Sequence, residues 1–503
     1  MMTPTGRTVV IAAVAAVGGV GALATDGGTG SPAPLPIGST RQLFVDRTLV
    51  ETLRSTTLQL HAPVRREVVF RFDAPWEGPQ SGYVTVMPDD GKIRLYYRGG
   101  GDLTREVACM AESTDGIRFT RPEFGLHEFS GSRRNNILWM PKEKGYQEAH
   151  NFTPFRDRNP AALPDERYKA VALARMIDPA VQDRRKMLVS LASPDGIHWR
   201  RLSNAPILSE GSFDSQNVAF WDTVRKEYAC YSRGGRNGVR SILRSTSPDF
   251  RRWSPQEYID LGPGAAEHLY TNAITPYFRA PALFLGFPMR FIPERKSIGA
   301  DRRAVDALSD SVLISSRDGV HWDRTFREAF LRPGLSPGNW GNGHGNNTPA
   351  WGLLQTGSGE LSLYWSENYG ATPHLRRGTL RLDGFVSVRA PASGGELVTR
   401  PLVFSGARLE LNYSTSAAGS IRVELMDAAG KTLSGFAQSD SVELYGDEIS
   451  RTVTWREHPQ VQTLAGKPIR VRFVMKDADL YSFRFAPVHD ATGIRSEADP
   501  CAR

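Results

Sequence analysis

The stretch Ser113-Thr-Asp-Gly-Ile-Arg-Phe119 returns as Ser193-Pro-Asp-Gly-Ile-His-Trp199 and as Ser316-Arg-Asp-Gly-Val-His-Trp322. A fourth copy, Ser247-Pro-Asp-Phe-Arg-Arg-Trp253, lacks the glycine. An aspartate in this position bonds its own backbone two residues further on, and glycine accepts a positive φ, so the pattern predicts a tight turn. Strand-like residues precede each copy, and the aromatic residue begins a returning strand. Each copy therefore indicates a β-hairpin.

The copies stand 54 to 80 residues apart, which is about the length of a four-stranded propeller blade with its loops. An apolar strand, usually with an aromatic residue, occurs five times between residues 93 and 365. Together they predict a five-bladed β-propeller over residues 39–382. We expect residues 42–60 to supply the strand that closes the ring of blades.

From about Asp383 the pattern changes. Strands such as Arg408–Asn412 and Ile469–Phe473 alternate apolar and charged residues, as half-buried antiparallel strands do. This predicts a C-terminal β-sandwich over residues 383–487 and a disordered tail over 488–503. The fold class is therefore all-β, a five-bladed propeller followed by a sandwich.

The first 24 residues have the features of a signal peptide. Arg7 gives a positive start, an apolar run follows, and Ala22-Leu-Ala24 fits a small-residue cleavage site. That run is too short for a membrane span, and no later segment predicts one. Residues 25–38, rich in Gly, Pro, Ser and Thr, are expected to be a flexible leader. These features predict a secreted protein, extracellular or periplasmic.

Composition narrows the function classes. Of 503 residues, 40% are hydrophobic and 23% are charged, as in soluble globular proteins. The net charge is +8, but the basic residues are interleaved with acids and form no stripe, so a nucleic-acid partner is not predicted. The three cysteines have no metal-ligand spacing, and we expect Cys109 and Cys230 to be buried free thiols. No metal site or cofactor is predicted, and nothing indicates an oligomeric state.

Several phrases resemble the five-bladed propeller proteins of glycoside hydrolase families 32 and 43, in particular the bacterial family 32-like group. They are Leu43-Phe-Val-Asp46, Ala74-Pro-Trp-Glu77, Phe213-Asp-Ser-Gln-Asn217, Leu269-Tyr-Thr-Asn272 and Leu382-Asp-Gly-Phe385. The Asn-Asp-Pro-Asn-Gly, Arg-Asp-Pro and Glu-Cys signatures of invertases are missing, so fructan cleavage is not implied. The resemblance implies a carbohydrate substrate, and a structural calcium ion occurs in some related propellers.

Glycoside hydrolysis usually needs two carboxyl groups. The predicted inner strands, which would line a central funnel, offer Glu77, Asp214 and Glu267. The resemblance implies that Glu267, on a late blade, is the general acid. Asp214 would hold the substrate or tune that acid, and Glu77 would be the base or nucleophile. Each of them could instead be a structural carboxylate; Asp46 and Asp157 are rivals.

Other polar and aromatic residues near the predicted inner strands are candidates for substrate binding. Amides can fix sugar hydroxyls, Arg233 and Arg290 can hold a carboxylate or sulfate, and Trp76 and Trp340 can stack on a sugar face. His150 and His344 can bind a substrate or be satisfied by their neighbours. The predicted substrate-binding residues are Trp76, His150, Asn151, Gln216, Asn217, Asn272, Arg233, Arg290, Trp340, His344 and Glu367.

The leading hypothesis is thus a secreted glycoside hydrolase that cleaves a poly- or oligosaccharide with carboxylate acid and base groups. The alternative is a non-catalytic glycan-binding propeller, which the missing invertase signatures favour. A lyase or phosphorylase is a third hypothesis, and a lyase would need a Tyr, His or Lys base beside an Arg. Fold alone does not separate them.

Overall fold

The structure is a computed structural model that describes residues 33–100, 106–141, 148–177, 184–298, 307–456, 458 and 460–487. The expected signal peptide, most of the expected leader and the expected tail lie outside these residues. Cys109 and Cys230 are free and buried, as expected.

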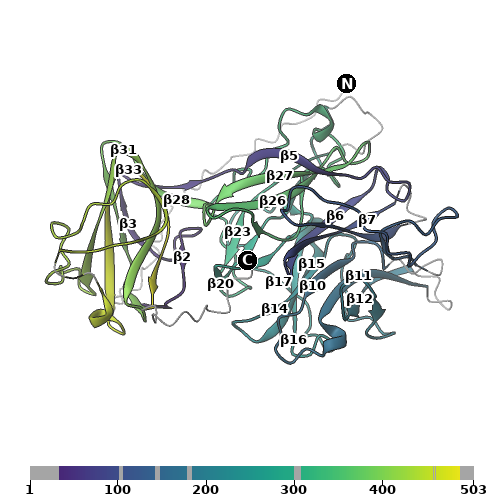
Figure 1. The fold of residues 1–503 in the computed structure, drawn as a ribbon, viewed down its shortest axis with the longest axis horizontal. Helices are drawn as coiled ribbons and strands as arrows, with labels where there is room; N and C mark the ends of the chain where they lie inside the picture. The colour runs from purple at the N-terminus through teal and green to yellow at the C-terminus, as the bar shows by residue number, and fades with distance from the viewer. Residues whose placement is uncertain are drawn as a thin grey trace, which may run out of the picture. The chain divides into compact units, whose positions relative to one another are not determined.

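The described residues form five blades in sequence, which confirms the predicted propeller (Figure 1). Each of the first three blades is a four-stranded antiparallel sheet. Blade 1 has β6 (Gly82–Asp89), β7 (Lys92–Gly99), β8 (Val107–Ser113) and β9 (Ile137–Trp139). Blade 2 has β10 (Thr153–Arg156), β11 (Tyr168–Ile177), β12 (Arg184–Ser193) and β13 (Arg200–Arg201), with the 3-10 turn η1 (Pro164–Glu166). Blade 3 has β14 (Val218–Asp222), β15 (Glu227–Arg236), β16 (Val239–Ser247) and β17 (Glu257–Tyr258).

Blades 4 and 5 depart from this pattern. Blade 4 is split into two three-stranded sheets, and blade 5 takes a strand from the start of the chain. The sheets of blade 4 are β18 (His268–Leu269), β21 (Met289–Ile292), β22 (Leu308–Ser311) and β19 (Thr275–Tyr277), β20 (Ala280–Gly286), β23 (Ile314–Ser316). Blade 5 has β24 (Thr348–Pro349), β25 (Leu354–Gln355), β26 (Glu360–Glu367), β27 (His374–Arg381) and β5 (Val64–Arg71), with η2 (Pro337–Asn339) before it.

The ring-closing strand is therefore β5, which pairs antiparallel with β27. The expectation that residues 42–60 close the ring is wrong. Those residues lie instead in the C-terminal sheet, because their strands pair with β33, β29 and β28.

The repeated turns connect neighbouring blades. Tyr96 Oη in blade 1 donates to the carbonyl of the turn glycine Gly196 in blade 2, at 3.1 Å. The same contact joins Tyr231 to Gly319 and Tyr364 to Gly116, the last between blades 5 and 1. All three glycines have φ between +72° and +82°, and a Cβ on each would lie 2.6 to 2.8 Å from the tyrosine oxygen. Glycine is needed here for the backbone and for the contact.

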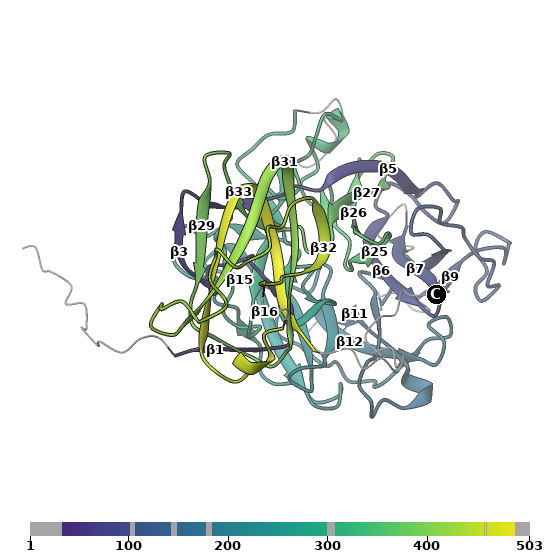
Figure 2. The same cartoon turned by 60° about the vertical axis from the view of Figure 1, so that its left-hand side comes forward.

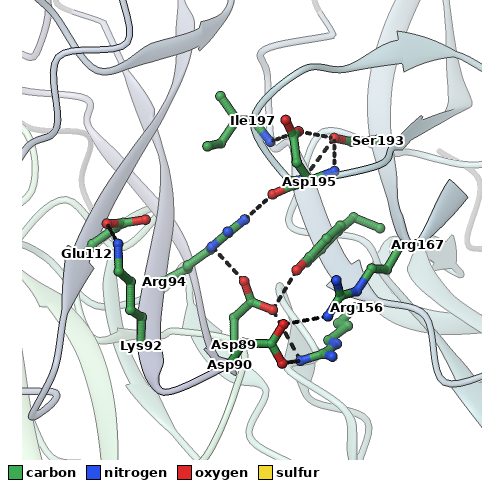
Figure 3. Close-up of polar contacts among 12 residues, drawn as sticks. Asp89, Asp90, Lys92, Arg94, Glu112, Arg156, Arg167, Ser193, Asp195 and Ile197 are labelled. Atoms are coloured by element: carbon green, nitrogen blue, oxygen red, sulfur yellow. Dashed lines mark hydrogen bonds and ion pairs between the residues drawn. The ribbon is translucent and has the colours of Figure 1, made fainter. Parts of the chain in front are cut away.

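Charged groups strengthen the contact between blades 1 and 2 (Figure 3). Arg94 of β7 lies between Asp89, whose carboxylate is 2.8 Å from Nε, and the carbonyl of Asp195 in the blade 2 turn. Asp195 itself accepts bonds from the backbone N–H of Ile197 and from Ser193 Oγ. The predicted turn chemistry is thus present, and it also carries the packing of one blade on the next.

The predicted C-terminal sandwich is a ten-stranded sheet. It encloses its own hydrophobic core, which includes Phe44, Leu411, Trp455 and Phe473. Its long strands bend at register shifts near residues 412 and 415. Figure 2 shows β1 and β3, from the start of the described chain, in this group of C-terminal strands. Its strands are β1 (Leu35–Gly38), β2 (Gln42–Leu43), β3 (Val50–Arg54), β4 (Thr57–Leu60), β28 (Val386–Ala390), β29 (Gly395–Thr399), β30 (Leu402–Phe404), β31 (Arg408–Asp427), β32 (Asp447–Thr452) and β33 (Ile469–Ala486), with η3 (Gln462–Leu464). The sandwich thus takes in residues 35–60, which the sequence assigned to the leader and the propeller.

A buried carboxylate connects this sandwich to blade 4. Asp383 accepts hydrogen bonds from Tyr277 of blade 4 at 2.7 Å and from Asn412 and Ser482 of the sandwich. Arg279 lies 3.0 Å from the same carboxylate. Removing one partner of a buried charge strongly destabilises a protein. The Asp383 carboxylate therefore couples the two domains.

Candidate active site

Polar and aromatic residues gather where the inner strands of the blades begin. They are Tyr83 at β6, His150 before β10, Asp214 before β14, Tyr270 after β18 and His344 before β24. The contacts between them cross from blade to blade, as for His150 with Asp214 and for His344 with Tyr270, whose ring centroids are 5.5 Å apart. These residues form one site, which we call the inner-strand site.

His150 lies between two carboxylates of the inner-strand site. Its Nε2 is 2.8 Å from Asp214 Oδ1, and its Nδ1 is 2.8 Å from both carboxyl oxygens of Glu106. Glu106 and His150 are buried. The imidazole therefore fixes the orientation of Asp214 from behind, in the way that a base is held by a third group in hydrolytic sites.

Lys186, at the start of β12, holds the other oxygen of Asp214 at 2.7 Å. Burial alone would raise the pKa of Asp214, but the hydrogen bonds and charges of His150 and Lys186 outweigh it and hold the pKa well below its usual range. About a third of each side chain is exposed, 33% for Asp214 and 34% for Lys186. Asp214 is thus a reachable, ionised carboxylate.

Arg98 lies beneath this group and is buried. It donates to Tyr369 Oη at 2.7 Å and to Asn151 at 3.3 Å, and its guanidinium lies 4.6 Å from the centre of the Tyr83 ring. Burial and the neighbouring tyrosines raise the pKa of Tyr83 well above its usual value, so this phenol stays protonated. The guanidinium and the phenols give the floor of the site a set of fixed donors.

The other side of the inner-strand site is aromatic. Tyr270 packs against Phe291 and His344, and the guanidinium of Arg233 lies 4.6 Å from the centre of its ring. Burial, with the charges of Arg240 and Arg233, lowers the pKa of His344. The predicted residues His150, Asp214, Arg233 and His344 are therefore brought together.

Glu77 lies elsewhere, inside blade 1. Its side chain is fully buried and accepts from Tyr97, Arg121 and the backbone N–H of Ala74. These are the contacts of a carboxylate that holds a loop to a strand. The structure therefore does not bring Glu77 to Asp214.

Glu267 likewise shares no contact partner with Asp214 among the described residues. Arg290 holds one of its oxygens at 2.9 Å, and Arg324 holds the other. Arg290 in turn binds Asp310 at 2.6 Å, so this predicted anion-binding arginine is already neutralised. The three expected catalytic carboxylates have no partner in common among the described residues.

Three of the predicted amides, Asn217, Asn272 and Gln216, donate to backbone carbonyls. Asn217 donates to the carbonyls of Phe213 and Ser215, and Asn272 donates to those of Gln216 and Tyr231. These bonds hold the blade 3 and blade 4 inner segments together. Gln216 likewise binds the carbonyl of Val84 across the ring.

The remaining predicted residues have structural partners. Trp76 donates to Asn136, and Trp340 donates to the carbonyl of Gly334. Glu367 is buried among Arg65, His374 and Arg376. Burial raises its pKa, but hydrogen bonds from His374 and Arg376 and the charges of the two arginines lower it, to about 2. The rivals Asp46 and Asp157 are bound by Arg317 and by Lys169.

Sequence reasoning missed Glu106, Lys186, Arg98, Arg240 and Tyr270. All of them except Tyr270 lie on or next to the second or third strand of a blade. One signal was available: Tyr270 stands within the quoted phrase Leu269-Tyr-Thr-Asn272. No local pattern marks Glu106 or Lys186, because their partners, His150 and Asp214, come from other parts of the chain.

A bound calcium ion does not fit the described residues. No group of three His, Cys, Asp or Glu side chains in them lies together as metal ligands would. The side-chain amide of Asn217 is committed to backbone carbonyls. Across the same described residues, the protein has no helix that is long and apolar enough to cross a membrane.

Two surface depressions lie away from the inner-strand site. One of about 490 Å³ is lined by sandwich residues such as Glu396 and Lys476, and one of about 370 Å³ by His61, Arg381 and their neighbours. Their linings contain no residue of the inner-strand site. The clustering of reactive side chains, rather than hollow shape, therefore locates the candidate active site.

No family model matches the sequence. No curated protein matches it either. Among solved structures, the chain is similar to a GH32 β-fructofuranosidase of Bombyx mori, at 11% identity over 84% of this chain and 95% of that one, with a TM-score of 0.42. A thermostable family-43 glycoside hydrolase matches at 12% identity over 63% and 95%, with a TM-score of 0.40. An N-acetylgalactosamine deacetylase from F. plautii, in complex with blood group B trisaccharide, matches at 13% over 65% and 96%, with a TM-score of 0.43. The expected structural resemblance is present at low sequence identity, and it is a likeness of fold.

Proposed function

We propose that this chain is a glycoside hydrolase that acts on a poly- or oligosaccharide, with Asp214 as the reacting carboxylate. The observation that carries the proposal is the contact of Asp214 with His150 and Lys186 at the start of the inner strands. An ionised, reachable carboxylate suits the positive charge that develops at the anomeric carbon. It acts there as nucleophile or as the base for water.

The proton for the leaving oxygen comes from a nitrogen acid in this proposal. Asp214 accepts from a cation, and Glu106 accepts from His150 and lies 3.7 Å from Arg98, so both carboxyls are held as acceptors. Of the two nitrogen groups beside Asp214, Lys186 is the exposed one, since the His150 side chain is only 6% exposed. Lys186 therefore gives the proton, and His150 and Glu106 are positioning residues.

The protons balance through the Asp214 and Lys186 contact. The glycosidic C–O bond breaks, and Lys186 protonates the leaving oxygen. Water adds to the anomeric carbon and loses a proton to Asp214. Because the two groups lie 2.7 Å apart, that proton returns to Lys186 and restores the starting state.

The experiment measures reducing-sugar release from a panel of neutral and anionic polysaccharides. Asp214→Asn and Lys186→Met are expected to lose at least about 100-fold in rate with their fold intact. Glu267→Gln, which removes an ion-paired carboxylate outside the site, is the matched control and should retain activity. Loss of activity in the control alone, with retention in Asp214→Asn, would refute the proposal. Silence of the wild type across the panel would favour the non-catalytic glycan-binding alternative.

Elimination is the second candidate function. Arg233 stacks on Tyr270, and an arginine beside a phenol is the arrangement that a polysaccharide lyase requires. The same assay separates the two reactions, because elimination creates a carbon–carbon double bond that absorbs ultraviolet light. Reducing ends without new absorbance indicate hydrolysis, and equal amounts of both indicate a lyase.

Export is part of the proposal. The apolar segment before Ala24 supports it, although those residues lie outside the described part of the chain. The test is N-terminal sequencing of the protein recovered from the medium or periplasm, which should begin shortly after Ala24. Recovery of the uncleaved chain from the cytosol would contradict export.

A further inference from the structure

Two arginines of blade 3 share one face of a hairpin beside the inner-strand site. Arg233 lies on β15 and Arg240 on β16, where the register pairs Arg233 with Ile242 and Gly235 with Arg240. These two strands are neighbours in the sheet of blade 3. Both guanidiniums lie over the ring of Tyr270, at 4.6 and 5.3 Å from its centre, and Arg240 also lies 4.4 Å from the centre of Phe291.

Neither arginine has an acidic partner among the residues that the structure describes. Arg233 gives one side-chain bond, to the carbonyl of Ser212 at 2.9 Å, and Arg240 lies 3.3 Å from His268 Nδ1. By contrast, Arg244 on the same strand binds Glu227, and Arg290 on the adjoining blade binds Glu267 and Asp310. With five N–H donors on each guanidinium, most donors of the pair remain available.

The two positive charges are close enough to act on their surroundings. Burial and the charge of Arg233 lower the pKa of Arg240, and burial with the charge of Arg240 lowers the pKa of His268. Holding two partly buried cations near one ring costs free energy unless an anion binds between them. The aromatic rings beneath them offer a flat surface of the kind on which sugars and guanidiniums pack.

This arginine pair lies next to the reacting carboxylate. The carbonyl of Ser212 accepts from Arg233, and the backbone N–H of Ser212 donates back to the Arg233 carbonyl at 3.0 Å. Ser212 is two residues before Asp214. A saccharide with one sugar unit at Asp214 can therefore reach the arginine pair with a neighbouring unit.

We propose that Arg233 and Arg240 form a subsite for an anionic substituent, a carboxylate or sulfate, on a sugar bound at the inner-strand site. The substrate class is thus an acidic glycan, and this rests on the proposed carbohydrate function. Guanidiniums match both oxyanions with paired, parallel hydrogen bonds. Tyr270 and Phe291 support the sugar face, and Asp214 lies at the bond that reacts.

The test uses binding, so that it does not depend on catalysis. Full-length Asp214→Asn protein is titrated calorimetrically with polygalacturonate and with a sulfated galactan. Each polymer is compared with its own neutral form, carboxyl-reduced or desulfated, at low and high salt. The same titrations are run on Asp214→Asn with Arg233→Gln and Arg240→Gln. Arg236→Gln on the same strand is the matched control, because it removes one exposed positive charge that faces away from the pair.

At least one charged polymer should bind about ten-fold or more tightly than its neutral form, and the double arginine substitution should remove this difference. Arg236→Gln should retain it, and high salt should weaken it. The polymer that shows the difference distinguishes carboxylate from sulfate. Arg233→Lys and Arg240→Lys together keep both charges and should retain part of the affinity, which separates charge loss from misfolding.

The proposal is overturned if the parent protein binds no charged polymer better than its neutral form, or if Arg236→Gln matches the double substitution. Failure of the proposed function gives a different result. In that case the wild type releases no reducing sugar while charge-dependent binding persists. If instead the wild type hydrolyses a neutral glycan and the arginine variants keep its rate, hydrolysis stands and the acidic subsite does not.

Discussion

The Nε2 atom of His150 lies 2.8 Å from Oδ1 of Asp214. This contact makes Asp214 anionic far into the acid range, because it adds to the effect of Lys186 and outweighs burial. The active form in the proposed reaction is the ionised one. Above about pH 4, the usual pKa of aspartate, protonation of Asp214 therefore does not limit the wild-type rate.

In the His150→Gln variant, the rate should depend on the protonation of Asp214. Without the imidazole, burial raises the pKa of Asp214, so the acid limb of kcat/KM should move to higher pH and the rate at neutral pH should fall. The pH profile of kcat/KM measures this shift. His198→Gln removes a histidine from an exposed turn and should leave the profile unchanged. An unmoved acid limb in His150→Gln would contradict the assigned role.

Glu77 is predicted to contribute to stability rather than to chemistry. Glu77→Gln leaves Arg121 and Tyr97 without their buried carboxylate, and the free energy of unfolding should fall by about 3 kcal/mol. Denaturant unfolding measures this loss, and the rate per folded molecule should stay near that of the wild type. A large drop in kcat without loss of stability would instead return Glu77 to the active site.

The turn glycines allow a matched test of the contacts between blades. Gly196 and Gly238 both have φ +76°, but a Cβ on Gly238 meets no atom within 4 Å, whereas one on Gly196 lies 2.6 Å from Tyr96 Oη. Gly238→Ala should cost about 1 kcal/mol of unfolding free energy, from the backbone alone. Gly196→Ala should cost about 1 to 3 kcal/mol more, from crowding. Equal losses in chemical denaturation would refute the role assigned to the contact.

The turn aspartates should make the propeller sensitive to acid. In Asp195 and Asp318, burial is outweighed by hydrogen bonds from a histidine and from backbone N–H groups, and the pKa is lowered to about 2. Because the folded pKa is below the unfolded value, the stabilisation is complete above about pH 4 and is lost as the pH falls through 2. Urea unfolding at pH 5, 3 and 2 measures it. Asp195→Asn and Asp318→Asn should each show a smaller fall in stability between pH 5 and pH 2 than the wild type.

The sequence predicted the parts of the fold that local chemistry decides. The Ser-x-Asp-Gly turns depend on bonds within a few residues, such as Asp195 to the N–H of Ile197, so the hairpins and blades followed from them. Strand partners are decided by distant residues. Val50–Arg54 mixes apolar and charged residues without a clear period, and nothing in it indicates that it pairs with β29 rather than with a blade.

For the candidate active site, the sequence indicated the positions of several residues but not their partners. His150, Asp214 and His344 stand just before inner strands, where the repeat suggested them, whereas Arg233 lies on the second strand of its blade. Glu77, Asp214 and Glu267 look alike in sequence, but their partners differ: a tyrosine and an arginine for Glu77, a histidine and a lysine for Asp214, and two arginines for Glu267. Only the folded arrangement supplies those partners, so the sequence could not separate the three carboxylates.

The pairing of β5 with β27, and of β1 to β4 with the C-terminal strands, sets the order in which the chain can assemble. Arg65 of β5 is held by Glu367, which is synthesised 302 residues later. Until then the early strands have unpaired edges, which are prone to aggregation, and such distant pairings make folding slow. The ring of blades can close as soon as β27 has been made. The sandwich needs β28 to β33 as well, so β1 to β4, which come first in the described chain, wait longest for their partners.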